Sequence, residues 1–125
     1  MKKIMVVDDI PDQIFTIKQG LESFDDEYEV IGASSGEQCI ELLNNGVVPN
    51  LILSETKMLG MNGRELLNRL KENPMWEEIP VFFLTAWEDK LTENSIARLG
   101  DDYIEKPVDA EELKKRIDTV LEKEQ

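Results

Sequence analysis

Short apolar runs alternate with helix-type patterns along the whole chain, and this alternation constrains the fold more than any other feature. Near-continuous apolar runs of this length are typical of parallel strands that are covered on both faces. The runs that we expect to form strands are, in chain order, residues 4–7, 28–33, 51–53, 81–84 and 102–104.

Between these runs, apolar residues recur every three or four positions, as they do on one face of a helix. Ser35, Asn62 and Asp109 each precede such a pattern and are suited to cap its first turn. A further helix is expected over residues 89–99, where the apolar pattern is sparser. Five strands alternating with five helices predict an α/β sandwich around a mostly parallel sheet, with right-handed crossovers.

The bulk properties restrict the class of protein. A chain of 125 residues suits one core, so residues 1–125 are expected to form a single domain. No apolar stretch is long enough to cross a bilayer or to act as a signal peptide, and Cys39 has no partner for an internal disulfide. We therefore expect a cytoplasmic protein. Its net charge of −13 argues against direct contact with nucleic acid or an anionic membrane.

Polar side chains stand just past the expected strands. Asp8 and Asp9 follow the first strand, Glu55 the third, Thr85 the fourth and Lys106 the fifth. Ligands of open parallel sheets bind beyond the carboxyl ends of the strands. Crowded carboxylates repel one another until a cation binds, and oxygen ligands without histidine indicate Mg²⁺. Lysine and threonine can hold phosphoryl oxygens, so the set predicts a magnesium-dependent phosphoryl site.

Each of these residues also has a simpler interpretation. Asp9 could cap the helix that follows Pro11, Thr85 could be an ordinary strand-end residue, and Lys106 could be a solvated turn lysine. The coincidence of suitable residues at four strand ends favours the functional interpretation of the set as a whole.

On these residues the chain resembles the receiver domains of two-component response regulators, over nearly its whole length. The resemblance implies a doubly wound (βα)5, flavodoxin-like fold with five parallel strands in the order 2-1-3-4-5. The segments that carry it are residues 4–9 (IMVVDD), 51–55 (LILSE), 58–63 (MLGMNG), 84–86 (LTA) and 100–107 (GDDYIEKP).

The resemblance implies a site for phosphorylation. In the family, an aspartate at the position of Glu55 accepts a phosphoryl group from a histidine kinase, a phosphotransfer protein or a small phosphodonor. Residues at the positions of Asp8 and Asp9 hold Mg²⁺ together with the acceptor and the backbone carbonyl at the position of Lys57.

The resemblance also implies a switch. Residues matching Thr85, the backbone of Ala86 and Lys106 bind the phosphoryl oxygens, and the aromatic residue matching Tyr103 turns inward as the threonine moves. The face made by the fourth helix, the fifth strand and the fifth helix then changes its affinity for a downstream effector protein. Such a domain is a signalling switch, not an enzyme.

Two residues depart from the family pattern. Glu55 replaces the acceptor aspartate, and its extra methylene displaces the carboxylate from the position that phosphoryl transfer requires. Leu59 stands where the family usually has proline. Glu55 has three explanations: a natural loss of phosphorylation, a weak mimic of the phosphorylated state, or an engineered change. Two departures in one loop favour natural divergence.

Two other classes of protein are alternatives to a receiver domain. A magnesium-dependent phosphohydrolase would use Asp8 as its nucleophile, but such enzymes usually carry a second aspartate at the position of Ile10. A flavodoxin-like flavin carrier would need a phosphate-binding loop rich in Ser, Thr and Gly after Val7, which this sequence lacks. The sequence is compatible with a single-domain regulator or with a piece of a longer one.

Overall fold

The structure, a computed structural model, describes residues 1–85 and 99–123. Within these residues the chain forms five strands and four helices. In chain order they are β1 (Lys2–Val7), α1 (Pro11–Glu22), β2 (Tyr28–Ala33), α2 (Gly36–Asn44), β3 (Leu51–Glu55), α3 (Gly63–Lys71), β4 (Val81–Thr85), β5 (Asp102–Glu105) and α4 (Ala110–Lys123).

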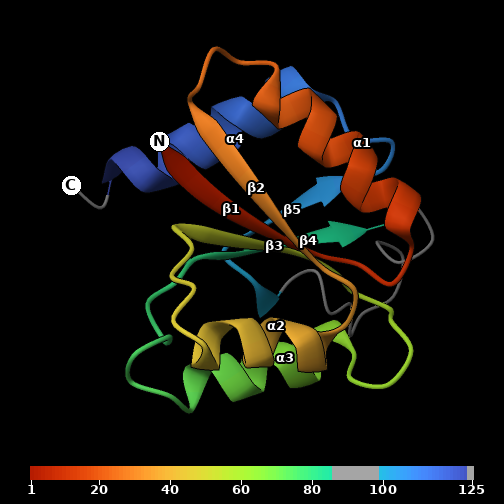
Figure 1. Ribbon diagram of the computed structural model, residues 1–125, viewed down its shortest axis with the longest axis vertical. Coiled ribbons are helices and arrows are strands. Elements are labelled where there is room, and N and C mark those ends of the chain that lie inside the picture. Colours follow the sequence, from red (N-terminus) through yellow and green to blue (C-terminus); the bar gives the residue numbers. More distant parts are fainter. Residues whose placement is uncertain (86–98, 124–125) are drawn as a thin grey trace.

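The strands form one sheet in the order β2-β1-β3-β4-β5, and every pair of neighbours is parallel. The expected fold class and strand order are therefore confirmed. Val7 lies opposite both Ala33 and Ser54, and Glu55 lies opposite Leu84. This register aligns the carboxyl ends of the central strands, so the residues that follow them share one edge of the sheet (Figure 1).

Helices cover both faces of the sheet, with α1 and α4 on one side and α2 and α3 on the other (Figure 1). Alternate residues of each strand enter different cores. Ile4 and Val6 pack with the first pair of helices, whereas Met5 and Val7 pack with the second pair. Because a buried cluster lies on each face of the sheet, the strands are continuous apolar runs. They lack the alternation of apolar and polar residues that is found where one face of a sheet meets solvent.

Three of the predicted helix caps are confirmed. The Ser35 hydroxyl accepts a hydrogen bond from Gln38 N at 3.0 Å, and Asn62 forms a capping box with Glu65 at the start of α3. Asp109 Oδ1 accepts from Glu111 N at 3.0 Å before α4. These caps satisfy amide groups that each helix start would otherwise leave without an acceptor.

Four strands extend further than the apolar runs predicted. β1 begins at Lys2, two residues before its run. β3 continues to Glu55, β4 to Thr85 and β5 to Glu105. Glu55 and Thr85 are thus the last residues of their strands, and both are buried. The helix expected over residues 89–99 lies, apart from Leu99, outside the described residues.

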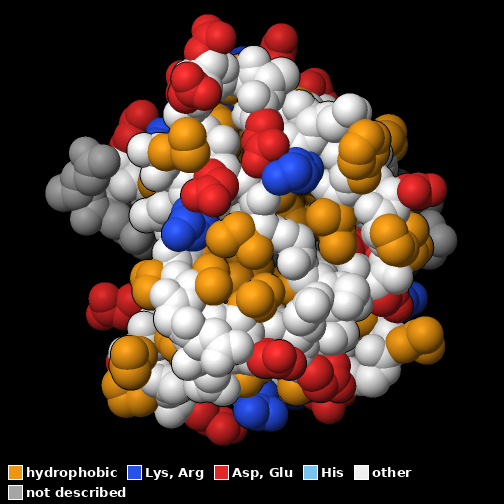
Figure 2. All heavy atoms as spheres, viewed as in Figure 1, with side chains coloured by type: hydrophobic (Ala, Val, Ile, Leu, Met, Phe, Trp, Pro, Cys, Tyr) orange, Lys and Arg blue, Asp and Glu red, His pale blue; other side chains and the backbone are white. Residues whose placement is uncertain are grey.

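The surface is strongly acidic, in keeping with the net charge of −13 (Figure 2). Acidic side chains are spread over the visible face, with a few lysines and arginines among them. No helix among the described residues has both the length and the apolar character needed to cross a membrane.

Candidate functional site

The carboxyl edge of the sheet gathers the residues that the sequence singled out. Asp8 and Asp9 follow β1, Glu55 ends β3, Thr85 ends β4 and Lys106 follows β5. Because strands β1, β3 and β4 are adjacent, residues from distant parts of the chain meet there. Asp8, Glu55 and Thr85 are buried, so their polar groups depend on partners within the protein.

Glu55 forms an ion pair with Lys106. The Lys106 Nζ group donates to Glu55 Oε2, and the Glu55 side chain is almost fully buried. Its other oxygen, Oε1, accepts from Thr56 N at 3.0 Å and from the Thr56 hydroxyl at 3.3 Å. Both carboxylate oxygens therefore have donors, and the interpretation of Lys106 as a solvated turn lysine is wrong.

Asp8 is only partly satisfied. Its side chain is 0% exposed, and Oδ1 accepts from Ile10 N at 2.9 Å. Among the described residues, Asp8 Oδ2 is buried without a hydrogen-bond partner. Burial raises the pKa of the Asp8 carboxyl, the Ile10 amide opposes this rise, and the Glu55 charge adds to it. A buried carboxylate oxygen that lacks a donor is a suitable ligand for a hard cation.

Asp9 contacts the loop that follows β3. Its Oδ2 accepts a hydrogen bond from Leu59 N at 3.0 Å. The residue that precedes α1 is Ile10, and no side chain caps this helix within the described residues. The interpretation of Asp9 as the cap of α1 is therefore wrong.

Leu59, which stands where the family usually has proline, takes part in the site through its backbone. The relevant group is its backbone N–H, which any residue other than proline would supply. The same applies to Thr56, whose amide and hydroxyl hold Glu55. The absence of proline at position 59 was the one signal in the sequence, because a backbone donor requires nothing else of residue type.

The three carboxylates share an edge but do not converge. Within residues 1–85 and 99–123, no three acidic, histidine or cysteine side chains are grouped so that they could hold one metal ion. Asp9 is directed to Leu59 N and Glu55 to Lys106, whereas Asp8 keeps an open oxygen. The residues thus fit a hard cation at Asp8, with the other two carboxylates engaged by donors of the chain.

Thr85 and Tyr103 connect this edge with β5. Thr85 is fully buried, and its carbonyl accepts from Lys106 N at 3.0 Å, which ties the lysine to the end of β4. Tyr103 lies on β5 and is 37% exposed. Ala86, whose backbone was expected to bind a phosphoryl oxygen, lies outside the described residues, and Lys57 is exposed.

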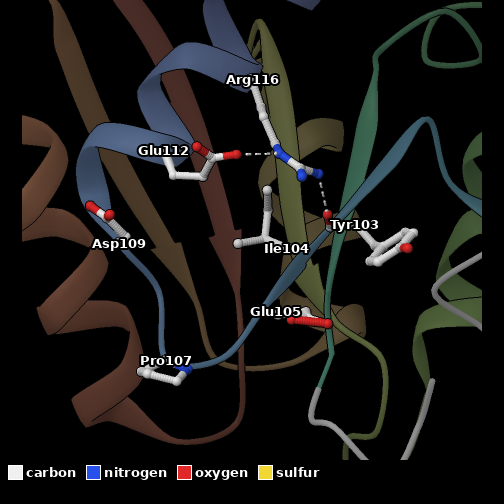
Figure 3. A pocket seen from close by; sticks show the side chains of 7 residues that line it. All are labelled: Tyr103, Ile104, Glu105, Pro107, Asp109, Glu112 and Arg116. Carbon is white, nitrogen blue, oxygen red and sulfur yellow. Dashed lines mark hydrogen bonds and ion pairs between the residues drawn. The ribbon is translucent and has the colours of Figure 1, made fainter. Parts of the chain in front are cut away.

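A pocket lies between β5 and the start of α4 (Figure 3). Arg116 crosses it and donates to Glu112 Oε1 at 3.0 Å, to Asp102 Oδ1 at 2.9 Å and to the Tyr103 carbonyl at 2.9 Å. The residues that line it are Tyr103, Ile104, Glu105, Pro107, Asp109, Glu112 and Arg116. This surface lies on the face that the family resemblance connects with effector binding.

Comparison with known families and proteins gives consistent results. The family model described as the response regulator receiver domain matches residues 4–118. A probable cyclic di-GMP phosphodiesterase of Vibrio cholerae is 38% identical over 120 residues, which cover 95% of this chain and 26% of that protein. The nitrate/nitrite response regulator protein NarL of Escherichia coli is 36% identical over 115 residues, covering 91% of this chain and 52% of NarL.

The chain thus spans about a quarter of the first relative and about half of the second. Among solved structures, a response regulator receiver domain protein from Clostridium thermocellum superposes with a TM-score of 0.85 and 26% sequence identity. The superposition covers 99% of this chain and 97% of that one, so the similarity extends over the entire fold.

Proposed function

The chain belongs to the response regulator receiver family, and we propose that it is a signalling module whose output is contact with another protein, without phosphorylation at position 55. The observation that carries this proposal is the buried ion pair between Glu55 and Lys106. Lys106 is the cation that would otherwise meet a phosphoryl oxygen. Here a permanent carboxylate of the chain already neutralises it.

The length of Glu55 supports this interpretation. One more methylene than aspartate carries the carboxylate toward Lys106, and Thr56 holds its second oxygen. A carboxylate bound on both oxygens is a poor nucleophile, and reaction geometry tolerates displacements of only about an ångström. Glu55 therefore provides charge at the acceptor position but little reactivity.

Tyr103 favours a module that acts by binding alone over a mimic of the phosphorylated state. In the family, the aromatic residue at this position turns inward on activation, whereas Tyr103 is 37% exposed. A carboxylate also carries one negative charge, against nearly two for a phosphoryl group. The Glu55–Lys106 pair thus neutralises the lysine in a structure in which Tyr103 is partly exposed.

Mg²⁺ binds weakly in this proposal, through Asp8, Asp9 and the backbone carbonyl of Lys57, with Glu55 as a further ligand only when it leaves Lys106. The ion would supply positive charge that offsets repulsion among the carboxylates. The open, buried oxygen of Asp8 supports this assignment.

The partners follow from the family. We propose a histidine kinase or phosphotransfer protein as the upstream partner and an effector protein as the downstream partner, in the cytoplasm. In the sequence, Thr85, Ala86 and Lys106 match the phosphoryl-binding residues of the family, which supports partners of the kind that bind receiver domains. We propose no enzymatic activity, since Ile10 stands where phosphohydrolases with an aspartate nucleophile at the position of Asp8 usually carry a second aspartate.

Intact-mass measurement after incubation with acetyl phosphate and Mg²⁺ tests the proposal. The chain, Glu55→Asp and Glu55→Asn are compared side by side, because the last two differ only in the presence of a carboxylate. We expect only Glu55→Asp to gain the mass of one phosphoryl group. A gain mapped to Glu55 in the unchanged chain would refute the proposal, and no gain in any variant would show that Glu55 is not the only obstacle.

A further inference from the structure

The backbone amide of Leu59 occupies a carboxylate oxygen of Asp9. Leu59 N lies 3.0 Å from Asp9 Oδ2, while the Leu59 side chain is 84% exposed. We propose that this amide is a built-in competitor of cation binding: it holds Asp9 away from a shared cation and thereby weakens Mg²⁺ binding. The inference rests on the proposed function only in taking Asp8 and Asp9 as the ligands.

The orientation of Asp9 is the first argument. Asp8 has an open, buried oxygen, yet no third acidic, histidine or cysteine group joins it among residues 1–85 and 99–123. Asp9 follows Asp8 directly in the chain, but its Oδ2 is directed at Leu59 N. A hydrogen bond to a carboxylate is charge-assisted, so turning Oδ2 of Asp9 toward a cation would weaken a favourable contact.

The rigidity of the loop is the second argument. Gly63 N donates to the Thr56 carbonyl at 2.9 Å, which closes the loop that contains Leu59. Met61 N donates to Glu37 Oε2 at 3.4 Å, and Gly60 adopts φ = 76°, a value that favours glycine. A Cβ on Gly63 would lie 2.8 Å from Phe83 and 3.0 Å from the Glu55 carbonyl, so the loop end packs closely against the sheet. These contacts anchor the loop that carries the Leu59 amide on the side that follows Leu59 in the chain.

The opposite role for the same hydrogen bond makes a different prediction. Ligating carboxylates are often oriented by a donor outside the metal site, and loss of such a donor weakens metal binding. If the Leu59 amide had this supporting role, its removal would lower the affinity for Mg²⁺. Whether removal of the Leu59 amide raises or lowers the affinity for Mg²⁺ therefore decides if the amide competes with the cation or supports its binding.

Leu59→Pro and Leu59→Ala separate the amide from the side chain. Proline deletes the N–H, whereas alanine removes the exposed side chain and keeps the N–H. With Mg²⁺ titrated calorimetrically, we expect Leu59→Pro to bind about three- to ten-fold more tightly than both the unchanged chain and Leu59→Ala. Equal or weaker binding by Leu59→Pro, or no binding at millimolar Mg²⁺, would overturn the proposal.

Amide resonances of the unchanged chain give a test that needs no variant. At saturating Mg²⁺ the Leu59 amide proton should exchange faster with solvent, because Asp9 has left it. The Lys3 amide, which donates to Asn50 Oδ1 at the opposite end of the sheet, serves as the internal control. A Leu59 amide that stays protected when Mg²⁺ is bound would contradict the inference. Neither experiment uses a phosphodonor, so failure here is distinct from failure of the proposed function.

Discussion

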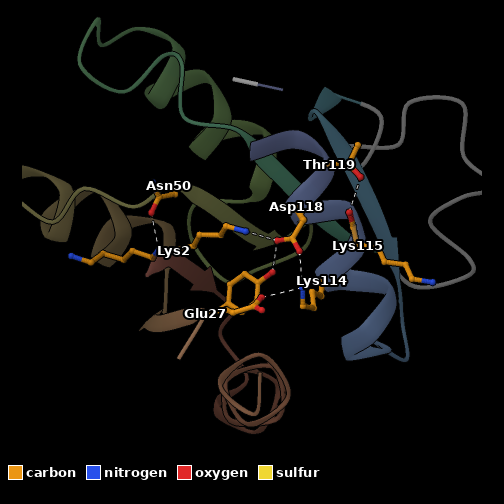
Figure 4. Close-up of polar contacts among 9 residues, drawn as sticks. Lys2, Glu27, Asn50, Lys114, Lys115, Asp118 and Thr119 are labelled. Atoms are coloured by element: carbon orange, nitrogen blue, oxygen red, sulfur yellow. Dashed lines mark hydrogen bonds and ion pairs between the residues drawn. The ribbon is translucent and has the colours of Figure 1, made fainter. Parts of the chain in front are cut away.

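The two ends of the sheet both bring carboxylates and lysines together, but they resolve the charge differently. At the carboxyl end, Asp8 keeps a buried oxygen without a partner among the described residues, and burial raises its pKa. At the amino end, Asp118 of α4 lies among donors from three elements of the chain (Figure 4). The comparison separates a site arranged for binding from one arranged for stability.

The amino-end network has Asp118 at its centre. Asp118 Oδ1 accepts from Lys2 Nζ at 2.7 Å and from the Tyr28 hydroxyl, and Oδ2 accepts from Lys114 Nζ at 2.8 Å. Lys114 also pairs with Glu27 at 3.0 Å. Although burial raises the pKa of Asp118, the hydrogen bonds from Lys114, Lys2 and Tyr28 outweigh it and lower the pKa to about 2. The network joins α4 to β1 and β2.

The difference shows how to distinguish structural from functional charge in this fold. A carboxylate with a lowered pKa stabilises the folded state at neutral pH, whereas one with a raised pKa destabilises it. Residues that reduce stability are retained where binding or chemistry requires them. Asp8, with its raised pKa, is a functional charge, whereas Asp118, with its lowered pKa, is a structural one.

The largest effect is expected for Asp118→Ala. The change leaves Lys2 and the Tyr28 hydroxyl without their acceptor, so the free energy of unfolding should fall by about 2–3 kcal/mol in urea denaturation. Thr119→Ala is the matched control, because Thr119 is the next residue of α4 and its hydroxyl donates to the Lys115 carbonyl of the same helix. The control should change stability by less than about 0.5 kcal/mol. Equal effects would remove the distinction between the network and an ordinary exposed position.

When the free energy of unfolding is measured against pH, the Asp118 carboxyl should contribute about 2 kcal/mol. The pKa of Asp118 is about 2 in the folded chain, below the ordinary value of 3.8, so its contribution is present above pH 4 and is lost as the pH falls toward 2. Asp118→Asn should flatten this part of the stability curve. If the stability of both chains falls in the same way below about pH 4, other carboxylates control acid unfolding.

Asp8→Asn should have a smaller effect of the opposite sign. Since the folded-state pKa of Asp8 is raised, its charge reduces stability at neutral pH, and removing that charge should stabilise the fold by about 1 kcal/mol. Stability of the unchanged chain should accordingly rise as the pH is lowered through this pKa, and the variant should lack that rise. If Asp8→Asn lowers the free energy of unfolding, Asp8 stabilises the fold as Asp118 does, and the proposed difference between the two ends of the sheet is wrong.

Sequence patterns predicted the sheet and most of its edge because both depend on residue type. Apolar runs identified the strands, and Ser35 and Asn62 marked helix starts. Of the strand-end residues, Glu55 and Lys106 are in contact, whereas the three carboxylates do not converge within the described residues. The order of the strands came from the family resemblance, since periodicity cannot choose among sheet topologies. The ends of strands were less accurate, because Glu55 and Thr85 are polar residues that nonetheless remain in the buried sheet.

The partners within the site could not be predicted. Whether Glu55 meets a cation or Lys106, and whether Asp9 caps α1 or meets Leu59 N, depends on side-chain directions that a sequence pattern does not specify. The Asp118 network was missed because its members are separated by up to 116 positions in the chain. Each looks like an ordinary surface charge when it is considered alone.

A double-mutant cycle on Glu55 and Lys106 tests the central claim most directly, namely that Glu55 takes the lysine that would otherwise meet a phosphoryl group. Free energies of unfolding would be measured for the chain, Glu55→Gln, Lys106→Met and the double variant. The account predicts a favourable coupling of about 1–3 kcal/mol, with Lys106→Met the more damaging single change because it leaves a buried carboxylate unpaired. A coupling indistinguishable from zero would contradict it.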